Sequence, residues 1–122
     1  MEERHRRLVR LLRERTGEAL RGVISYDADD IDVLYVREDL ATGELREALP
    51  EGVRRLRERR PIVPETYAAF GDYRATTEVY DGAVILDFPT AERAGVLVTL
   101  NPDAATQLSE FVSRCSAVLR DD

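Results

Sequence analysis

The most concentrated chemical feature of the sequence is a run of five arginines within seven residues: Arg54, Arg55, Arg57, Arg59 and Arg60. Guanidinium groups bind carboxylates and phosphates through paired hydrogen bonds, so this run could dock an acidic protein, a phosphate or an RNA. The alternative is a solvated helix face that forms ion pairs with Glu51, Glu58 and the acidic second half of the chain. Charge runs on helices are mostly solvent faces, which favours that alternative. We keep the five arginines as a candidate partner-binding surface.

A second cluster is acidic and consists of Asp27, Asp29, Asp30 and Asp32, followed by Glu38. Glu38 stands at position 12 counted from Asp27, as the last ligand of a calcium-binding loop does. Such a loop also needs glycine at position 6 and an oxygen ligand at position 5, and Asp32 and Ile31 occupy these places. The cluster is therefore interpreted as solvated turn aspartates, and we predict no metal site.

The sequence contains no arrangement that is typical of an enzyme. His5 is the only histidine, and neither a nucleophile nor an acid is positioned to form a triad with it. Cys115 lies in the apolar stripe of the last expected helix, far from its N-terminus, which predicts a buried and inert thiol. No glycine-rich phosphate loop occurs. We therefore predict a protein that is not an enzyme, with no catalytic residue and no cofactor.

Composition and charge restrict the class of protein. The chain has 122 residues and a net charge of -6, with 18 basic residues, all of them arginine, and 24 acidic ones. This length fits a single domain over 1–122. No apolar run approaches the ~20 residues that a membrane span needs. We expect a cytoplasmic protein without membrane contact. The whole excess of negative charge lies in residues 61–122, which disfavours binding of nucleic acid.

The first half of the chain predicts a helix followed by a hairpin. Apolar residues recur on one side of a helix over 3–16, and Gly17 favours its end because glycine adopts positive φ without strain. Leu20–Tyr26 and Ile31–Arg37 are rich in β-branched and aromatic residues and predict two strands. The aspartates between them are typical of a turn.

The middle of the chain predicts helices. Thr42 is the expected N-cap of a helix in which Pro50 predicts a kink or a division into two short helices. Glu65–Phe70 predicts a further helical turn that Gly71 ends.

Three strands and a helix are expected in the last part of the chain. The strands are predicted at Tyr73–Tyr80, Ala83–Phe88 and Gly95–Leu100. Asp81-Gly82 predicts a type I′ turn, and 89–94 predicts a polar loop. The last helix is expected to begin at Asn101, and its apolar stripe comprises Ala104, Leu108, Phe111, Val112, Cys115, Val118 and Leu119.

This order predicts an α+β fold, a single α-β-β-α-β-β-β-α domain with a five-stranded antiparallel sheet. The two terminal helices are expected on one face and the middle helix on the other. The element order resembles that of roadblock/LC7 domains, which have a profilin-like architecture. Tyr26-Asp27 with the string from Asp32 to Leu40 resembles a stretch found in a family of small haloarchaeal proteins. Arginine-only, acid-rich composition also suggests a high-GC, salt-adapted genome.

Two functions are weighed for this fold. An open sheet leaves edge strands that must be covered, charged or paired with another chain. The roadblock resemblance implies a homodimer that serves a small GTPase or another acidic partner. On this hypothesis the chain is a non-catalytic interaction and scaffold module, with Tyr73–Tyr80 as the pairing strand. The alternative is a sensory domain that holds a small molecule, with a pocket lined by Tyr26, Tyr35, Tyr67, Tyr73 and Tyr80.

Overall fold

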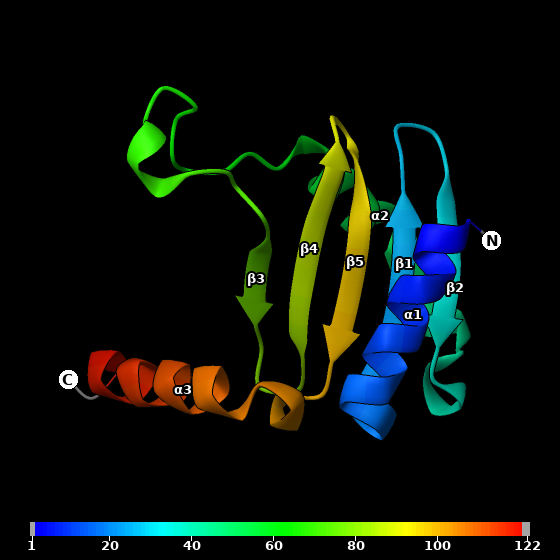
Figure 1. Cartoon of the computed structure of the whole chain (residues 1–122). Coiled ribbons are helices and arrows are strands. Elements are labelled where there is room, and N and C mark those ends of the chain that lie inside the picture. Colours follow the sequence, from blue (N-terminus) through cyan, green and yellow to red (C-terminus); the bar gives the residue numbers. More distant parts are fainter. Residues whose placement is uncertain (1, 121–122) are drawn as a thin grey trace.

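The central feature of the structure, a computed structural model that describes residues 2–120, is a five-stranded antiparallel sheet (Figure 1). Its strands are β1 (Leu20–Tyr26), β2 (Ile31–Val36), β3 (Thr76–Val79), β4 (Val84–Ala91) and β5 (Ala94–Leu100). They lie in the order β2-β1-β5-β4-β3, and every neighbouring pair is antiparallel. The α+β class and the antiparallel sheet are therefore confirmed.

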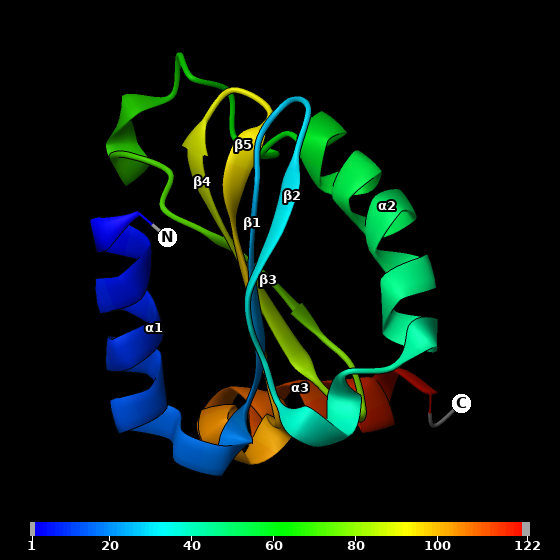
Figure 2. The same cartoon turned by 90° about the vertical axis from the view of Figure 1, so that its right-hand side faces the viewer.

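Three helices surround this sheet. Helices α1 (Glu3–Thr16) and α2 (Gly43–Glu58) cover opposite faces, as Figure 2 shows. Helix α3 (Thr106–Arg120) crosses the lower end of the sheet and continues past β3 (Figure 1). Its main contacts are with the preceding turn Pro102–Ala105. This position differs from the expected packing, in which both terminal helices would share one face.

The hydrophobic core lies between α1 and the sheet. Leu8, Val9 and Leu12 of α1 pack against a cluster of strand residues that are at most 6% exposed: Leu20, Val23, Val96, Val98 and Leu100. On the opposite face, α2 buries Val53 almost completely. Successive side chains of a strand alternate between the two faces, so each strand contributes to both layers. Within residues 2–120, no helix has the length and apolarity that crossing a membrane requires.

The expected end of α1 and start of α2 are present, whereas the last helix does not begin at Asn101. A 3-10 turn, Pro102–Ala105, comes first without a side-chain cap from Asn101, and α3 begins at Thr106. Gly17 follows α1 with a φ of 53°, and the Thr42 hydroxyl accepts a hydrogen bond of 3.3 Å from the Leu45 N–H at the start of α2. Pro50 does not divide α2, which is one helix from Gly43 to Glu58. Proline removes only one hydrogen bond of the helix ladder, and the cap and the burial of Val53 hold the two halves together.

The two later hairpins differ from the sequence prediction. The Tyr80 N–H donates to the Ala83 carbonyl at 2.8 Å, but neither Asp81 nor Gly82 has the positive φ of a type I′ turn. Strand β3 is shorter than Tyr73–Tyr80, whereas β4 continues through the expected loop to Ala91.

Pro89 is tolerated inside β4 because β3 pairs with β4 only as far as Asp87. At Pro89, β4 is therefore an edge strand and needs no N–H donor on that side. A two-residue turn, Glu92-Arg93, connects β4 to β5, and Arg93 adopts a φ of 60°. The expected helical turn at Glu65–Phe70 is reduced to a 3-10 turn at Ala68–Phe70.

Candidate functional site

A hydrogen bond between two buried polar side chains crosses the sheet on the α2 face. The Tyr26 hydroxyl of β1 donates to Asp87 Oδ1 of β4 at 2.7 Å, although β5 lies between these strands. Tyr26 is 6% exposed and Asp87 is 3% exposed. Burial raises the pKa of both groups, because it removes water from their charged forms. The hydrogen bond raises the pKa of Tyr26 further and opposes the rise for Asp87.

Gly95 makes this crossing possible. It pairs with Tyr26 in β1 and with Pro89 in β4, so the Tyr26 ring passes directly over it. A Cβ at this position would lie 2.7 Å from the Tyr26 hydroxyl oxygen and 2.7 Å from the Phe88 carbonyl oxygen. Only glycine leaves room for the ring. The glycine and the two polar residues thus form one structural unit.

A second polar group lies beside this unit, between the end of α2 and strand β3. Arg59 forms an ion pair with Glu78, and the Tyr80 hydroxyl donates to Glu78 Oε1 at 2.6 Å. The Tyr80 bond is the main cause that lowers the pKa of Glu78, and Arg59 adds to the effect. Arg59 also lowers the pKa of Asp87 while Glu78 raises it. The two polar groups are therefore electrostatically linked.

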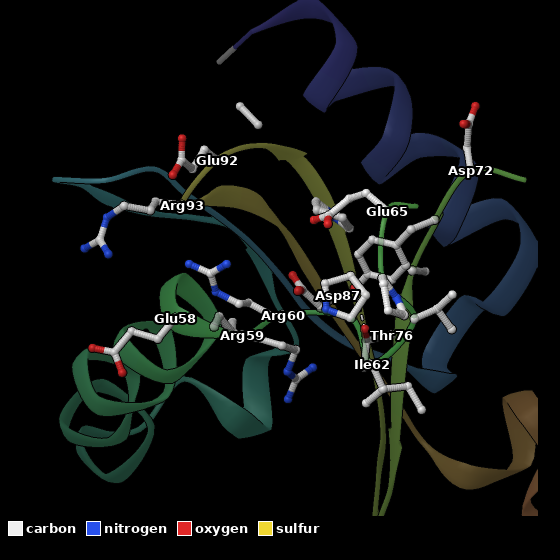
Figure 3. Close-up of a pocket in the computed structure, with 18 of the residues that line it drawn as sticks. Glu58, Arg59, Arg60, Ile62, Glu65, Asp72, Thr76, Asp87, Glu92 and Arg93 are labelled. Atoms are coloured by element: carbon white, nitrogen blue, oxygen red, sulfur yellow. Dashed lines mark hydrogen bonds between the residues drawn. The ribbon is translucent and has the colours of Figure 1, made fainter. Parts of the chain in front are cut away.

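Tyr26 and Asp87 of the first group and Arg59 of the second line a cavity of about 1460 Å³ between the sheet and the connecting segment 59–75. Figure 3 shows labelled residues of its lining, including Arg60, Glu65 and Asp87. Part of the wall is aromatic: the rings of Tyr67 and Phe70 meet edge to face, with centroids 5.0 Å apart. We refer to this space as the Asp87 cavity. Its lining combines a buried carboxylate, further charged side chains and exposed aromatic rings.

Three of the five tyrosines expected in a pocket line the Asp87 cavity, namely Tyr26, Tyr67 and Tyr73. Tyr35 and Tyr80 do not line it. Tyr35 lies on the β2 edge under the guanidinium of Arg13, 5.1 Å from the ring centroid. The structure thus brings three of the five tyrosines to one cavity and leaves the other two outside it.

The guanidinium groups of the arginine run are largely engaged within the chain. Arg54 pairs with Glu51 and Glu58, and Arg55 lies 3.5 Å from Glu51. This pairing within α2 lowers the pKa of Glu51, chiefly through the Arg54 hydrogen bond. These contacts are the ion pairs along a helix face that were weighed against a partner-binding surface.

Arg57 connects α2 to the aspartate turn. Its Nε donates to the Asp27 carbonyl at 2.7 Å, and its Nη2 donates to the Asp30 carbonyl at 3.2 Å. Asp27 Oδ1 accepts from the N–H groups of Asp29 and Asp30, which lowers the pKa of Asp27. These contacts are those of a turn. Over residues 2–120 no group of three or more His, Cys, Asp or Glu side chains could hold a metal ion.

Helix α3 exposes its apolar side. Leu108, Phe111, Val118 and Leu119 are between 41% and 76% exposed. Cys115 is exposed as well, so the expectation that its thiol is buried is wrong. That expectation assumed that the apolar stripe faces the sheet, whereas α3 lies at the end of the sheet (Figure 1). Most of the stripe therefore has no cover within the described residues, and only Val112 of its large side chains is half-buried.

Sequence reasoning missed Asp87 and Gly95, and it expected ion pairs of the arginine run with the acidic second half without naming Glu78 as the partner of Arg59. One signal was available: Asp87 is the only charged residue in the otherwise apolar stretch 83–88. A charge in such a strand is buried only where it has a partner. Neither the partner nor the role of Gly95 could be inferred from spacing, because Tyr26 and Asp87 are 61 positions apart.

The fold and these features define a small α+β domain with a polar cavity on one sheet face and an uncovered terminal helix. The family model described as a domain of unknown function (DUF7522) matches residues 6–120, and the chain belongs to that family. No curated protein and no solved structure matches the chain.

Proposed function

We propose that this protein is a non-catalytic interaction module that works as a homodimer assembled through α3. The observation that carries the proposal is the exposed apolar side of this helix. Phe111 is 66% exposed, Val118 73% and Leu119 76%. Large apolar side chains at helical spacing normally face a core, and a contiguous exposed patch is typical of a protein contact.

The spacing of the exposed residues supports pairing between two copies of α3. Leu108, Phe111, Cys115 and Val118 follow one another at intervals of three and four residues, which is the period of helices that pack side by side. In an antiparallel pair, Phe111 of one copy lies opposite Cys115 of the other, so that a large side chain meets a small one. A two-fold contact buries the same stripe on both protomers.

The net charge of -6 opposes association at low ionic strength. Salt screens this repulsion over about 10 Å at 0.1 M and about 3 Å at 1 M, whereas apolar contacts persist. The proposed dimer therefore strengthens with salt. This behaviour suits the salt-adapted, haloarchaeal source that the composition and the 26–40 segment suggest.

The element order also supports a scaffold role like that of roadblock proteins. In this role the dimer would bind an acidic partner, such as a small GTPase, at the arginine run. Arg60 is the member of the run best placed for this contact. It has no hydrogen-bond or ion-pair partner within residues 2–120, whereas Arg54, Arg57 and Arg59 are engaged.

The test is light scattering of the full chain at 0.15 M and 2 M NaCl. We expect a dimer whose dissociation constant falls with salt, and a monomer for Phe111→Ser. Phe70→Ser is the matched control, because Phe70 is 72% exposed and lies outside α3; it should remain dimeric. A monomeric wild-type chain at both salt concentrations, or a dimer that Phe111→Ser leaves intact, would overturn the proposal.

A further inference from the structure

We propose that the Asp87 cavity binds a small organic cation. Its ammonium group pairs with the Asp87 carboxylate, and its apolar body lies against the aromatic wall of the cavity. This inference goes beyond self-association, which involves α3 and does not use the cavity.

The first argument is that Asp87 is a buried acid without a cation. It forms no ion pair with any arginine or histidine of residues 2–120, and Tyr26 donates to Oδ1 only. Every fully buried side-chain oxygen or nitrogen of the described residues has a hydrogen-bond partner. Oδ2 has none, so it must be open to the cavity that Asp87 lines. An ammonium group at Oδ2 would replace the solvation that burial has removed.

The second argument is the charge balance of the lining. Two lining charges are paired with an opposite charge, Glu58 with Arg54 and Arg59 with Glu78. Arg57 donates to backbone carbonyls, which leave its positive charge in place. The lining charges that are not paired with an opposite charge are four acids and three arginines: Glu65, Asp72, Asp87, Glu92, Arg57, Arg60 and Arg93. An excess of carboxylates attracts a cation and disfavours an anion.

The third argument is the aromatic wall. Tyr67 is 51% exposed, Phe70 72% and Tyr73 42%, and all three line the cavity. Aromatic ring faces attract cations, and they attract organic ammonium groups most effectively when water is excluded. A ligand in the cavity would cover rings that are otherwise in contact with water. The residues that line the cavity thus supply both a charge and an apolar surface.

The same observations favour an organic cation over a metal ion. The described residues bring no three metal-binding side chains together, and Asp87 has one open carboxylate oxygen. The cavity of about 1460 Å³ is larger than common ligand sites, which measure ~300–1,000 Å³. It therefore has room for a molecule with an aromatic or aliphatic body.

The test is calorimetric titration of the full chain with three compounds of one shape. 2-Phenylethylamine carries a positive charge, 3-phenylpropionate a negative charge and 2-phenylethanol none. We expect the amine to bind at least about tenfold more tightly than the other two. Asp87→Asn keeps an acceptor for the Tyr26 hydroxyl and should weaken amine binding by about tenfold or more.

Two further variants keep the test decisive. Glu110→Gln removes one negative charge from α3, outside the cavity lining, and should leave the affinity unchanged. Phe70→Ser changes an exposed side chain, so it should fold even where Asp87→Asn does not, and should weaken amine binding several-fold. Equal affinity for the three compounds, no binding of the amine at millimolar concentration, or an amine affinity that neither cavity variant changes would overturn the proposal.

Discussion

Replacement of Gly95 by alanine tests whether the Tyr26–Asp87 bond depends on the absence of a side chain on β5. The added Cβ would lie 2.7 Å from the Phe88 carbonyl oxygen and 2.7 Å from the Tyr26 hydroxyl oxygen. Because both distances are shorter than any ordinary carbon–oxygen contact, the strand, the ring or both must move. The ring can move only by giving up its hydrogen bond to the buried carboxylate.

The expected cost follows from these two displacements. Overpacking of a well-packed site costs about 1–3 kcal/mol. Loss of a hydrogen bond to a buried charged group costs about 1.5–3 kcal/mol. We therefore expect Gly95→Ala to lower the free energy of unfolding by about 3 kcal/mol. For a urea dependence of about 1.5–2 kcal/mol per molar, the unfolding midpoint falls by about 1.5–2 M.

The assay is urea unfolding followed by circular dichroism, at one fixed protein concentration because dimer formation would contribute to stability. Gly52→Ala is the matched control. Gly52 lies inside α2, and a Cβ there meets nothing within 4 Å, so alanine should stabilise the helix by about 0.5–1 kcal/mol.

A double-mutant cycle separates the two causes. Tyr26→Phe removes the hydroxyl that the new Cβ would contact, so Gly95→Ala should cost at least about 1 kcal/mol less in that background. A cost below about 0.5 kcal/mol for Gly95→Ala, or equal costs in both backgrounds, would refute the crossing as the reason for glycine.

Two other predictions concern α2 and the buried acid. Pro50→Ala should raise the free energy of unfolding by up to about 3 kcal/mol, because it restores a helix hydrogen bond and removes the ring clash. Thermal unfolding measures the gain. A loss of stability would contradict the helical geometry at this position. The pKa of Asp87 is higher in the folded chain than its ordinary value of 3.8, so folding favours its protonated form. The stability of the wild type relative to Asp87→Asn should therefore rise as pH falls from 7 through the folded pKa, and level off below the unfolded one. Urea unfolding of both proteins from pH 7 to pH 3 measures this difference in stability. A difference that stays constant with pH would show that burial does not raise the pKa of the Asp87 carboxyl.

The sequence predicts much of the local structure correctly. Residues that are close together in the sequence suffice to predict several features. These are the bounds of β1 and α1, the end of α1 at Gly17 and the Thr42 cap. β-Branched runs, apolar periodicity and cap residues act over such short distances. The turn at Asp81-Gly82 shows the limit, because its preferred type is replaced by another geometry with the same hydrogen-bonded ends.

The candidate sites show where local reasoning ends. The apolar stripe of α3 is evident in the sequence, but its exposure depends on where the helix lies relative to a sheet built from distant strands. Tyr26 could be named as a pocket residue because it is aromatic and lies in a strand. Its bond to Asp87 exists only because β1 and β4 both flank β5.

The sequence alone thus determined the element types, the α+β class and the uneven distribution of charge, since these depend on residue type and short spacing. The tertiary structure alone decided that Gly95 must be glycine, that Asp87 is buried beside a cavity and that the guanidinium of Arg57 reaches the turn at Asp27. Each of these facts joins residues that are 30 or more positions apart or depends on the order of strands in the sheet. Such contacts form only when the whole chain folds, because the free energy that sets them comes from burial and strand pairing across the molecule.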